Sequence, residues 1–130
     1  METITERRRV GKVSMPAGTY IVGDPCYSIS DERWMEWLES ANYENSDILE
    51  AELDGYKCLG LGTMYGDGMY RDNEGHVYGV DAGLIGLVPI ALCPDHDPHL
   101  RVVKFNTDFT CYRGKSGRLR FGSIVIQTGD

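Results

Sequence analysis

The sequence predicts a β-rich α+β protein, in which a mainly antiparallel sheet curls into a sandwich or barrel and one amphipathic helix, at about 31–41, covers it. Three observations lead to this class. The 130 residues include 16 glycines, a level that favours turns and bulges over long helices. Short apolar runs follow one another at close spacing, with turn sequences and no alternating helices between them. A chain of 130 residues is also the size of one domain, so we expect a single domain over 1–130.

The only convincing helical periodicity lies in residues 31–41. Four apolar side chains recur there at i, i+3, i+4 and i+7, and so share one helix face: Trp34, Trp37, Leu38 and Ala41. Ser30 or Asp31 can accept the N–H groups at the start of this helix, and acidic residues suit the positive end of its dipole.

Nearly all the remaining apolar runs have strand character. The expected strands are 9–15, 19–22, 48–53, 57–63, 76–80, 84–92, 100–105, 109–113 and 118–127. Asp-Gly or Gly-containing sequences at 54–55, 72–75 and 114–117 separate neighbouring runs and are typical of hairpin turns. These turns favour antiparallel pairing.

The net charge of −7 is distributed unevenly along the chain. Residues 1–20 carry +2, residues 21–98 carry −13 and residues 99–130 carry +4. An acidic surface repels phosphate, so we expect no general nucleic-acid binding and no binding to an anionic membrane. A local basic patch is still compatible with a small anionic ligand.

The chain has no signal for export, membrane insertion or zinc binding. No run of eighteen apolar residues is present, and no apolar stretch follows the first positive charges, so we expect a cytoplasmic protein. The cysteines at 26, 58, 93 and 111 contain no CxxC pair, which excludes a zinc ribbon or redox motif and favours free thiols.

Three short segments, 22–27, 65–70 and 78–83, place Asp beside Gly and Tyr. Glycine leaves backbone N–H groups accessible, carboxylates accept hydrogen bonds, and tyrosines offer a flat face and a hydroxyl. We therefore expect a small-molecule pocket that includes Asp24, Tyr27, Tyr65, Gly66, Asp67, Gly68, Tyr70, Asp81 and Gly83. The alternative is that each segment is an ordinary turn or bulge whose Asp bonds its own backbone and whose Tyr packs at the rim.

The expected contacts to phosphate come from basic residues around the turn at 114–117. They are Arg113, Lys115, Arg118 and Arg120. Arg118 and Arg120 alternate with Leu119 and Phe121, so on a strand both arginines face one way. The alternative is a solvated sheet face whose charges prevent aggregation.

The same motifs resemble a family of small, uncharacterised proteins of bacteriophages and prophages. The resemblance rests on GDPCY at 23–27, on YGDG at 65–68 followed by Tyr70, and on YGVD at 78–81, and it covers roughly 16–92. It implies a phage protein that acts in the host-cell cytoplasm and has a compact β-rich fold, but it carries no established active site. Many members have Ser where this chain has Ala82.

These observations together lead us to expect a non-enzymatic protein that sequesters an anionic, nucleotide-type host defence signal. We expect no cofactor and no metal, and we expect the chain to form homo-oligomers, because small β domains often build pockets at symmetric interfaces. Two alternatives stay open. Asp24, Asp67 and Asp81 could hold Mg²⁺ or Ca²⁺ in a hydrolase that degrades such a nucleotide, or the acidic middle could bind and inhibit a host enzyme.

Overall fold

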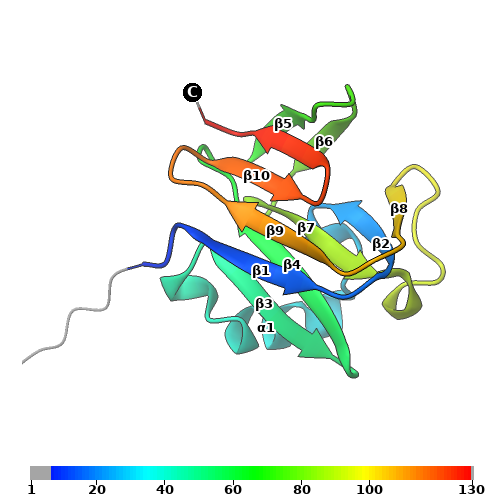
Figure 1. The fold of residues 1–130 in the computed structure, drawn as a ribbon. Coiled ribbons are helices and arrows are strands. Elements are labelled where there is room, and N and C mark those ends of the chain that lie inside the picture. Colours follow the sequence, from blue (N-terminus) through cyan, green and yellow to red (C-terminus); the bar gives the residue numbers. More distant parts are fainter. Residues whose placement is uncertain (1–6, 130) are drawn as a thin grey trace, which may run out of the picture.

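A computed structural model of the chain describes residues 7–129 and contains two large antiparallel sheets, a small hairpin and one α-helix (Figure 1). The four-stranded sheet has the order β1-β9-β10-β11, and the five-stranded sheet has the order β3-β4-β7-β2-β8. Strands β5 and β6 pair with each other. The predicted class, β-rich and antiparallel with a single α-helix, is confirmed in these residues.

The bounds of the elements follow the chain in order. The strands are β1 (Gly11–Met15), β2 (Gly18–Gly23), β3 (Ile48–Leu53), β4 (Tyr56–Gly62), β5 (Gly68–Arg71), β6 (Val77–Val80), β7 (Leu84–Pro89), β8 (Arg101–Phe105), β9 (Phe109–Arg113), β10 (Arg118–Phe121) and β11 (Ile124–Gln127). The helix is α1 (Asp31–Ser40), and short 3-10 helices cover Pro25–Tyr27, Tyr43–Asn45 and Ile90–Leu92.

The two large sheets share one core. Side chains from β1, β9, β10 and β11 pack there against side chains from β2, β4 and β7, with Leu119 and Phe121 on one side and Leu59 and Leu87 on the other, all 0% exposed. Within residues 7–129 the sheets do not close into a barrel, so the sandwich is the arrangement that forms.

A second core lies between the five-stranded sheet and α1. Trp37 is fully buried there with Leu49, Cys58 and Val88, and its indole N–H donates to the Ala51 carbonyl at 3.2 Å. The five-stranded sheet is therefore covered on both faces. This double burial explains why β4 and β7 are nearly continuous apolar runs rather than alternating ones.

The expected turns form where Gly or Asp-Gly sequences stand. At the β3–β4 turn both Asp54 (φ 52°) and Gly55 (φ 82°) are left-handed, as a two-residue hairpin turn with the twist of its strands requires. Two expected strands were wrong in detail. The run 84–92 ends as a strand at Pro89 and continues as a 3-10 helix over Ile90–Leu92. The run 118–127 is two strands, because Gly122 at φ 61° turns the chain between β10 and β11.

The β5–β6 hairpin is attached to the rest of the fold through its turn. The backbone N–H and the side-chain oxygen of Asn73 bond to Val125 of β11, each at 2.9 Å, and its amide nitrogen donates to the Ser123 carbonyl at 3.0 Å. Tyr78 and Val80 of β6 enter the core between the sheets. In the part of the chain described, no helix is long and apolar enough to cross a membrane.

Candidate functional site

Asp24 joins the first and third Gly-Asp-Tyr segments. Its side chain is buried at 3% exposure and accepts three backbone N–H groups, from Cys26 at 3.0 Å, from Asp81 at 2.8 Å and from Ala82 at 2.7 Å. Both carboxylate oxygens are thus used inside the protein. Asp24, expected as a ligand contact, thus joins two of the three segments.

Tyr27 connects the same two segments at the surface. Its hydroxyl donates to the Asp81 carboxylate, while its ring remains 46% exposed. Asp81 is exposed as well. These two side chains are accessible to a partner from solution.

The second segment meets the third at Gly66 and Gly83. The Gly66 carbonyl accepts the Thr63 hydroxyl at 2.6 Å and the Tyr70 hydroxyl at 2.9 Å, and a side chain at Gly83 would lie 3.8 Å from the Gly66 Cα. The backbone N–H of Thr63 donates to the Gly83 carbonyl at 3.0 Å. The three segments therefore converge, and we call this group, Asp24, Tyr27, Gly66, Asp67, Asp81 and Gly83, the motif junction.

The other residues expected in this part of the site lie beside the motif junction. Tyr65 is 64% exposed and Gly68 is exposed, whereas Tyr70 is half-buried and packs against the core between the sheets.

The Cys26 thiol beside the motif junction does not have the pKa of an activated nucleophile. Burial raises the pKa of the Cys26 thiol to about 12, and a hydrogen bond with Asp24 and the negative charges of Asp24, Asp81 and Asp67 act in the same direction. The thiol therefore stays protonated at neutral pH. Among residues 7–129, no three His, Cys, Asp or Glu side chains are grouped so that they could hold a metal ion. All four cysteines are free thiols.

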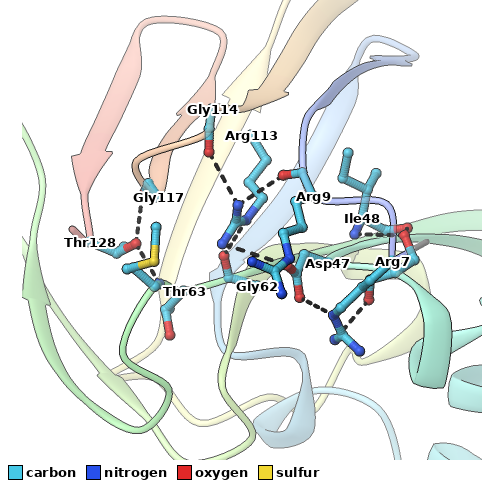
Figure 2. Close-up of polar contacts among 12 residues, drawn as sticks. Arg7, Arg9, Asp47, Ile48, Gly62, Thr63, Arg113, Gly114, Gly117 and Thr128 are labelled. Carbon is cyan, nitrogen blue, oxygen red and sulfur yellow. Dashed lines mark hydrogen bonds and ion pairs between the residues drawn. The ribbon is translucent and has the colours of Figure 1, made fainter.

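Arg113 is buried at 3% exposure, and Figure 2 shows the polar groups around its guanidinium. Its guanidinium donates to the carbonyl oxygens of Gly62 at 2.8 Å, Arg9 at 2.8 Å and Gly114 at 3.2 Å, and it lies 3.7 Å from an oxygen of Asp47. Burial lowers the pKa of Arg113, the charge of Asp47 opposes that shift, and the nearby positive charges add to it. These contacts, with Gly62 of β4 among them, hold β9 against β4 and direct the Arg113 guanidinium into the protein.

The outer face of the four-stranded sheet carries the accessible positive charge. Arg118 and Arg120 of β10 are exposed, while Leu119 and Phe121 point inward at 0% exposure, as the alternation predicts. Across the sheet, Lys12 of β1 and Arg120 both pair in register with Tyr112 of β9. We call Lys12, Tyr112, Arg118 and Arg120 the basic face.

The basic face lines an open hollow of about 740 Å³. Thr110 and Gly122 complete its lining, which contains no carboxylate. Among residues 7–129, Lys12, Arg118 and Arg120 make no ion pair, whereas Arg7, Arg8, Arg33, Lys57, Arg101 and Arg113 all do. The cations of the basic face are therefore available to an anion.

The structure separates the predicted site into two surfaces. Lys115 is exposed in the turn between β9 and β10. It lines neither the hollow of the basic face nor the motif junction. Lys12 and Tyr112 were not expected in the site. Strand alternation could have placed each of them on the outer face of its strand. It could not have shown that the two are neighbours, because β1 and β9 are far apart in the chain.

Comparisons with known proteins do not place the chain in a family. No protein-family model matches it, and no solved structure matches it. The TonB-dependent receptor P39 of Formosa agariphila is 29% identical over 116 residues, which cover 78% of this chain and 10% of the receptor. The chain thus spans about a tenth of the length of the curated relative that it matches.

Proposed function

We propose that this chain is a non-enzymatic binding protein that holds a small anionic ligand of nucleotide type on its basic face. The observation that carries the proposal is the set of three cations around Tyr112 that no described carboxylate neutralises. Charge-assisted hydrogen bonds from such groups to phosphate are about twice as strong as neutral ones.

The spacing of the basic face suits a ligand with more than one phosphate. Arg118 and Arg120 are two residues apart on one strand, which separates their Cα atoms by about 7 Å. Lys12 lies two strands away from Arg120, at about 10 Å, with Tyr112 between them. Phosphates can contact the arginines while a base stacks on Tyr112, and such a stack contributes about 1 to 3 kcal/mol.

The charge elsewhere on the molecule favours a small ligand over a polymer. The chain as a whole carries −7, so a long polyanion would extend from the basic face toward acidic surface and be repelled. The hollow of about 740 Å³ lies within the range of small-molecule sites, about 300 to 1,000 Å³. With the resemblance to phage proteins, this supports sequestration of a host nucleotide signal as the role we propose.

Isothermal titration calorimetry tests the site with ATP and with a cyclic dinucleotide as probes. The double variant Arg118→Gln/Arg120→Gln should weaken binding at least about tenfold, and Tyr112→Ala should weaken binding of the nucleotide more than that of inorganic triphosphate. Lys104→Gln is the matched control, because Lys104 is an exposed cation of β8 outside the hollow. Unchanged affinity in the double variant would overturn the proposal.

Recovery of the ligand distinguishes sequestration from hydrolysis. Native mass spectrometry of the complex, followed by denaturation, should return the probe intact and in a fixed ratio to protein, and the same spectra report any self-association. Several turnovers per chain, abolished by a chelator, would instead favour the hydrolase.

A further inference from the structure

A second cavity, of about 410 Å³, lies between α1 and one end of the five-stranded sheet. Apolar and aromatic side chains form much of its walls, and polar side chains form the rest. The apolar and aromatic ones are Trp34, Leu38, Tyr43, Leu49 and Leu84, and the polar ones are Arg7, Ser46, Asp47 and Thr63. It shares no lining residue with the hollow of the basic face. We call it the Trp34 pocket.

Local backbone geometry keeps the Trp34 pocket open. Asn42 at φ 58° ends the helix and turns the chain into the short 3-10 helix that begins with Tyr43. On the opposite wall, Gly62 and Gly83 have no side chains, and a Cβ at Gly62 would lie 3.0 Å from an oxygen of Asp47. A side chain at Gly62 would therefore crowd Asp47 at the charged end of the cavity.

One end of the Trp34 pocket holds a fixed guanidinium. Arg7 donates from Nε to Asp47 at 2.8 Å and from its two terminal nitrogens to the carbonyl oxygens of Glu44 at 2.9 Å and Ser46 at 3.2 Å. Arg7 and Asp47 both appear in Figure 2. A guanidinium has five N–H groups, and these contacts use three of those of Arg7. The other two make no hydrogen bond to residues 7–129. The Arg7 side chain is 40% exposed.

Two guanidinium groups flank the carboxylate at this end. Asp47 lies 2.8 Å from Arg7 and 3.7 Å from Arg113, and Figure 2 draws all three side chains. Farther along the wall, the Tyr43 hydroxyl donates to the Glu44 carboxylate at 3.4 Å. The two unused N–H groups of Arg7 therefore offer a place for one carboxylate beside the apolar side chains of the cavity. A ligand that complements both features has an apolar body and a single negative charge.

We propose that the Trp34 pocket binds an aromatic monocarboxylate, whose ring lies between Trp34 and Tyr43 and whose carboxylate meets Arg7. Two aromatic walls favour a flat ring, since offset or edge-to-face pairs add about 0.5 to 1.5 kcal/mol each beyond burial. The planar fork of Arg7 suits a carboxylate oxygen in a fixed direction. This site is independent of the nucleotide site proposed above.

Nuclear magnetic resonance of the indole N–H groups tests the proposal with 2-naphthoate, 2-naphthamide and 2-naphthylmethylamine as probes. The chain has two tryptophans, so two indole signals are expected, and Trp34→Phe assigns them. The Trp34 signal should shift on titration, whereas Trp37, which is fully buried and bonded to Ala51, should move less. Affinity should fall in the order carboxylate, amide, ammonium, and Arg7→Met should reduce the affinity for naphthoate to that for the amide.

A variant that fills the mouth of the pocket keeps the test valid if Arg7→Met fails to fold. Ala82 is exposed and lines the pocket, so Ala82→Phe should abolish the shift, whereas Ala91→Phe, exposed and outside the lining, should retain it. Equal affinity for the three probes, or a shift that persists in Ala82→Phe, would overturn the proposal. Arg118→Gln/Arg120→Gln should bind naphthoate normally, so failure of either proposal leaves the other intact.

Discussion

Asp24 shows how the surroundings of a single residue decide its role. Alone in the sequence, a carboxylate between Gly and Pro is equally suited to bind a ligand or to satisfy its own backbone. In the structure it accepts one N–H from its own turn and two from the segment that contains Asp81. Two of its three partners come from another part of the chain, so no local rule could have identified them.

Asp72 is a second buried carboxylate, and its surroundings make stability depend on pH. It accepts the Tyr78 hydroxyl at 2.7 Å and the backbone N–H groups of Glu74 at 2.8 Å and His76 at 2.9 Å, and it pairs with Arg101. Burial alone would raise the pKa of Asp72, but these hydrogen bonds and the charge of Arg101 outweigh burial and lower it. Arg101, bound to Asp72 and Glu74, is therefore unavailable to phosphate.

We predict that the ionised Asp72 stabilises the folded chain above the ordinary pKa range of aspartate and that this contribution is lost as pH falls through the lowered folded-state value. The unfolded chain binds the proton at higher pH than the folded chain does, so acid favours unfolding. Urea unfolding between about pH 7 and about pH 3 should show the stability gap between wild type and Asp72→Asn narrowing toward acid.

A companion variant tests the contribution of the hydrogen bond from the Tyr78 hydroxyl to Asp72. Tyr78→Phe removes one donor and so brings the folded-state pKa of Asp72 closer to the unfolded-state value. The acid-dependent loss of stability should therefore be smaller than in wild type and complete at a higher pH. If the difference in unfolding free energy between wild type and Asp72→Asn stayed constant from about pH 7 to about pH 3, the assigned role of Asp72 would be contradicted.

At the scale of the elements, β7 depends on glycine at the point where it pairs with β4. Gly86 lies opposite Gly60 in β4 and Gly23 in β2. A Cβ at Gly86 would lie 1.8 Å from the Leu59 carbonyl oxygen and 2.8 Å from the Gly60 Cα. Both contacts are to backbone, so rotation of a side chain cannot relieve them.

We therefore predict that Gly86→Ala separates β4 from β7 and lowers the free energy of unfolding by about 1 to 3 kcal/mol or more. The matched control is Gly79→Ala in β6, where the nearest atom to a Cβ is the sulfur of Met69 at 3.5 Å. That variant should stay within about 0.5 kcal/mol of wild type. Urea unfolding followed by circular dichroism measures both, and equal stability of the two variants would refute the predicted clash.

At the scale of the whole molecule, the five-stranded sheet joins the two cores. β4 contributes Leu59 and Leu61 to the core between the sheets and Cys58 to the core beneath α1. Successive side chains of β4 enter different cores. Unfolding of either core therefore also displaces the strand that both cores share.

We predict that the two cores unfold together. Leu119→Ala, in the core between the sheets, should cost about 2 to 5 kcal/mol. It should shift the tryptophan fluorescence transition by as much as the circular dichroism transition, although both tryptophans pack in the other core. Leu53→Ala, beneath α1, should likewise shift both signals equally. Transitions that separate in either variant would show that the cores are independent.

Much of the fold could be predicted because it depends on short-range patterns. Helical spacing located α1, Asp-Gly and Gly-rich sequences located the hairpins, and alternation in 118–121 put two arginines outside and two apolar residues inside. Alternation could also have predicted that Arg113 points inward, because Arg113 shares its strand face with buried Cys111 and not with Tyr112. We instead expected a ligand contact from Arg113, because the residue is charged and lies beside a turn.

The sequence by itself determined the β-rich class, the helix and the three Gly-Asp-Tyr segments, because each is encoded within a few residues. Only the tertiary structure decided that these segments meet around Asp24, that Arg113 is buried, and that Lys12 lies beside Tyr112 and Arg120. Each of these depends on the register between strands that are far apart in the chain. That register is set by the burial of the sheet faces, which no local run of residues encodes.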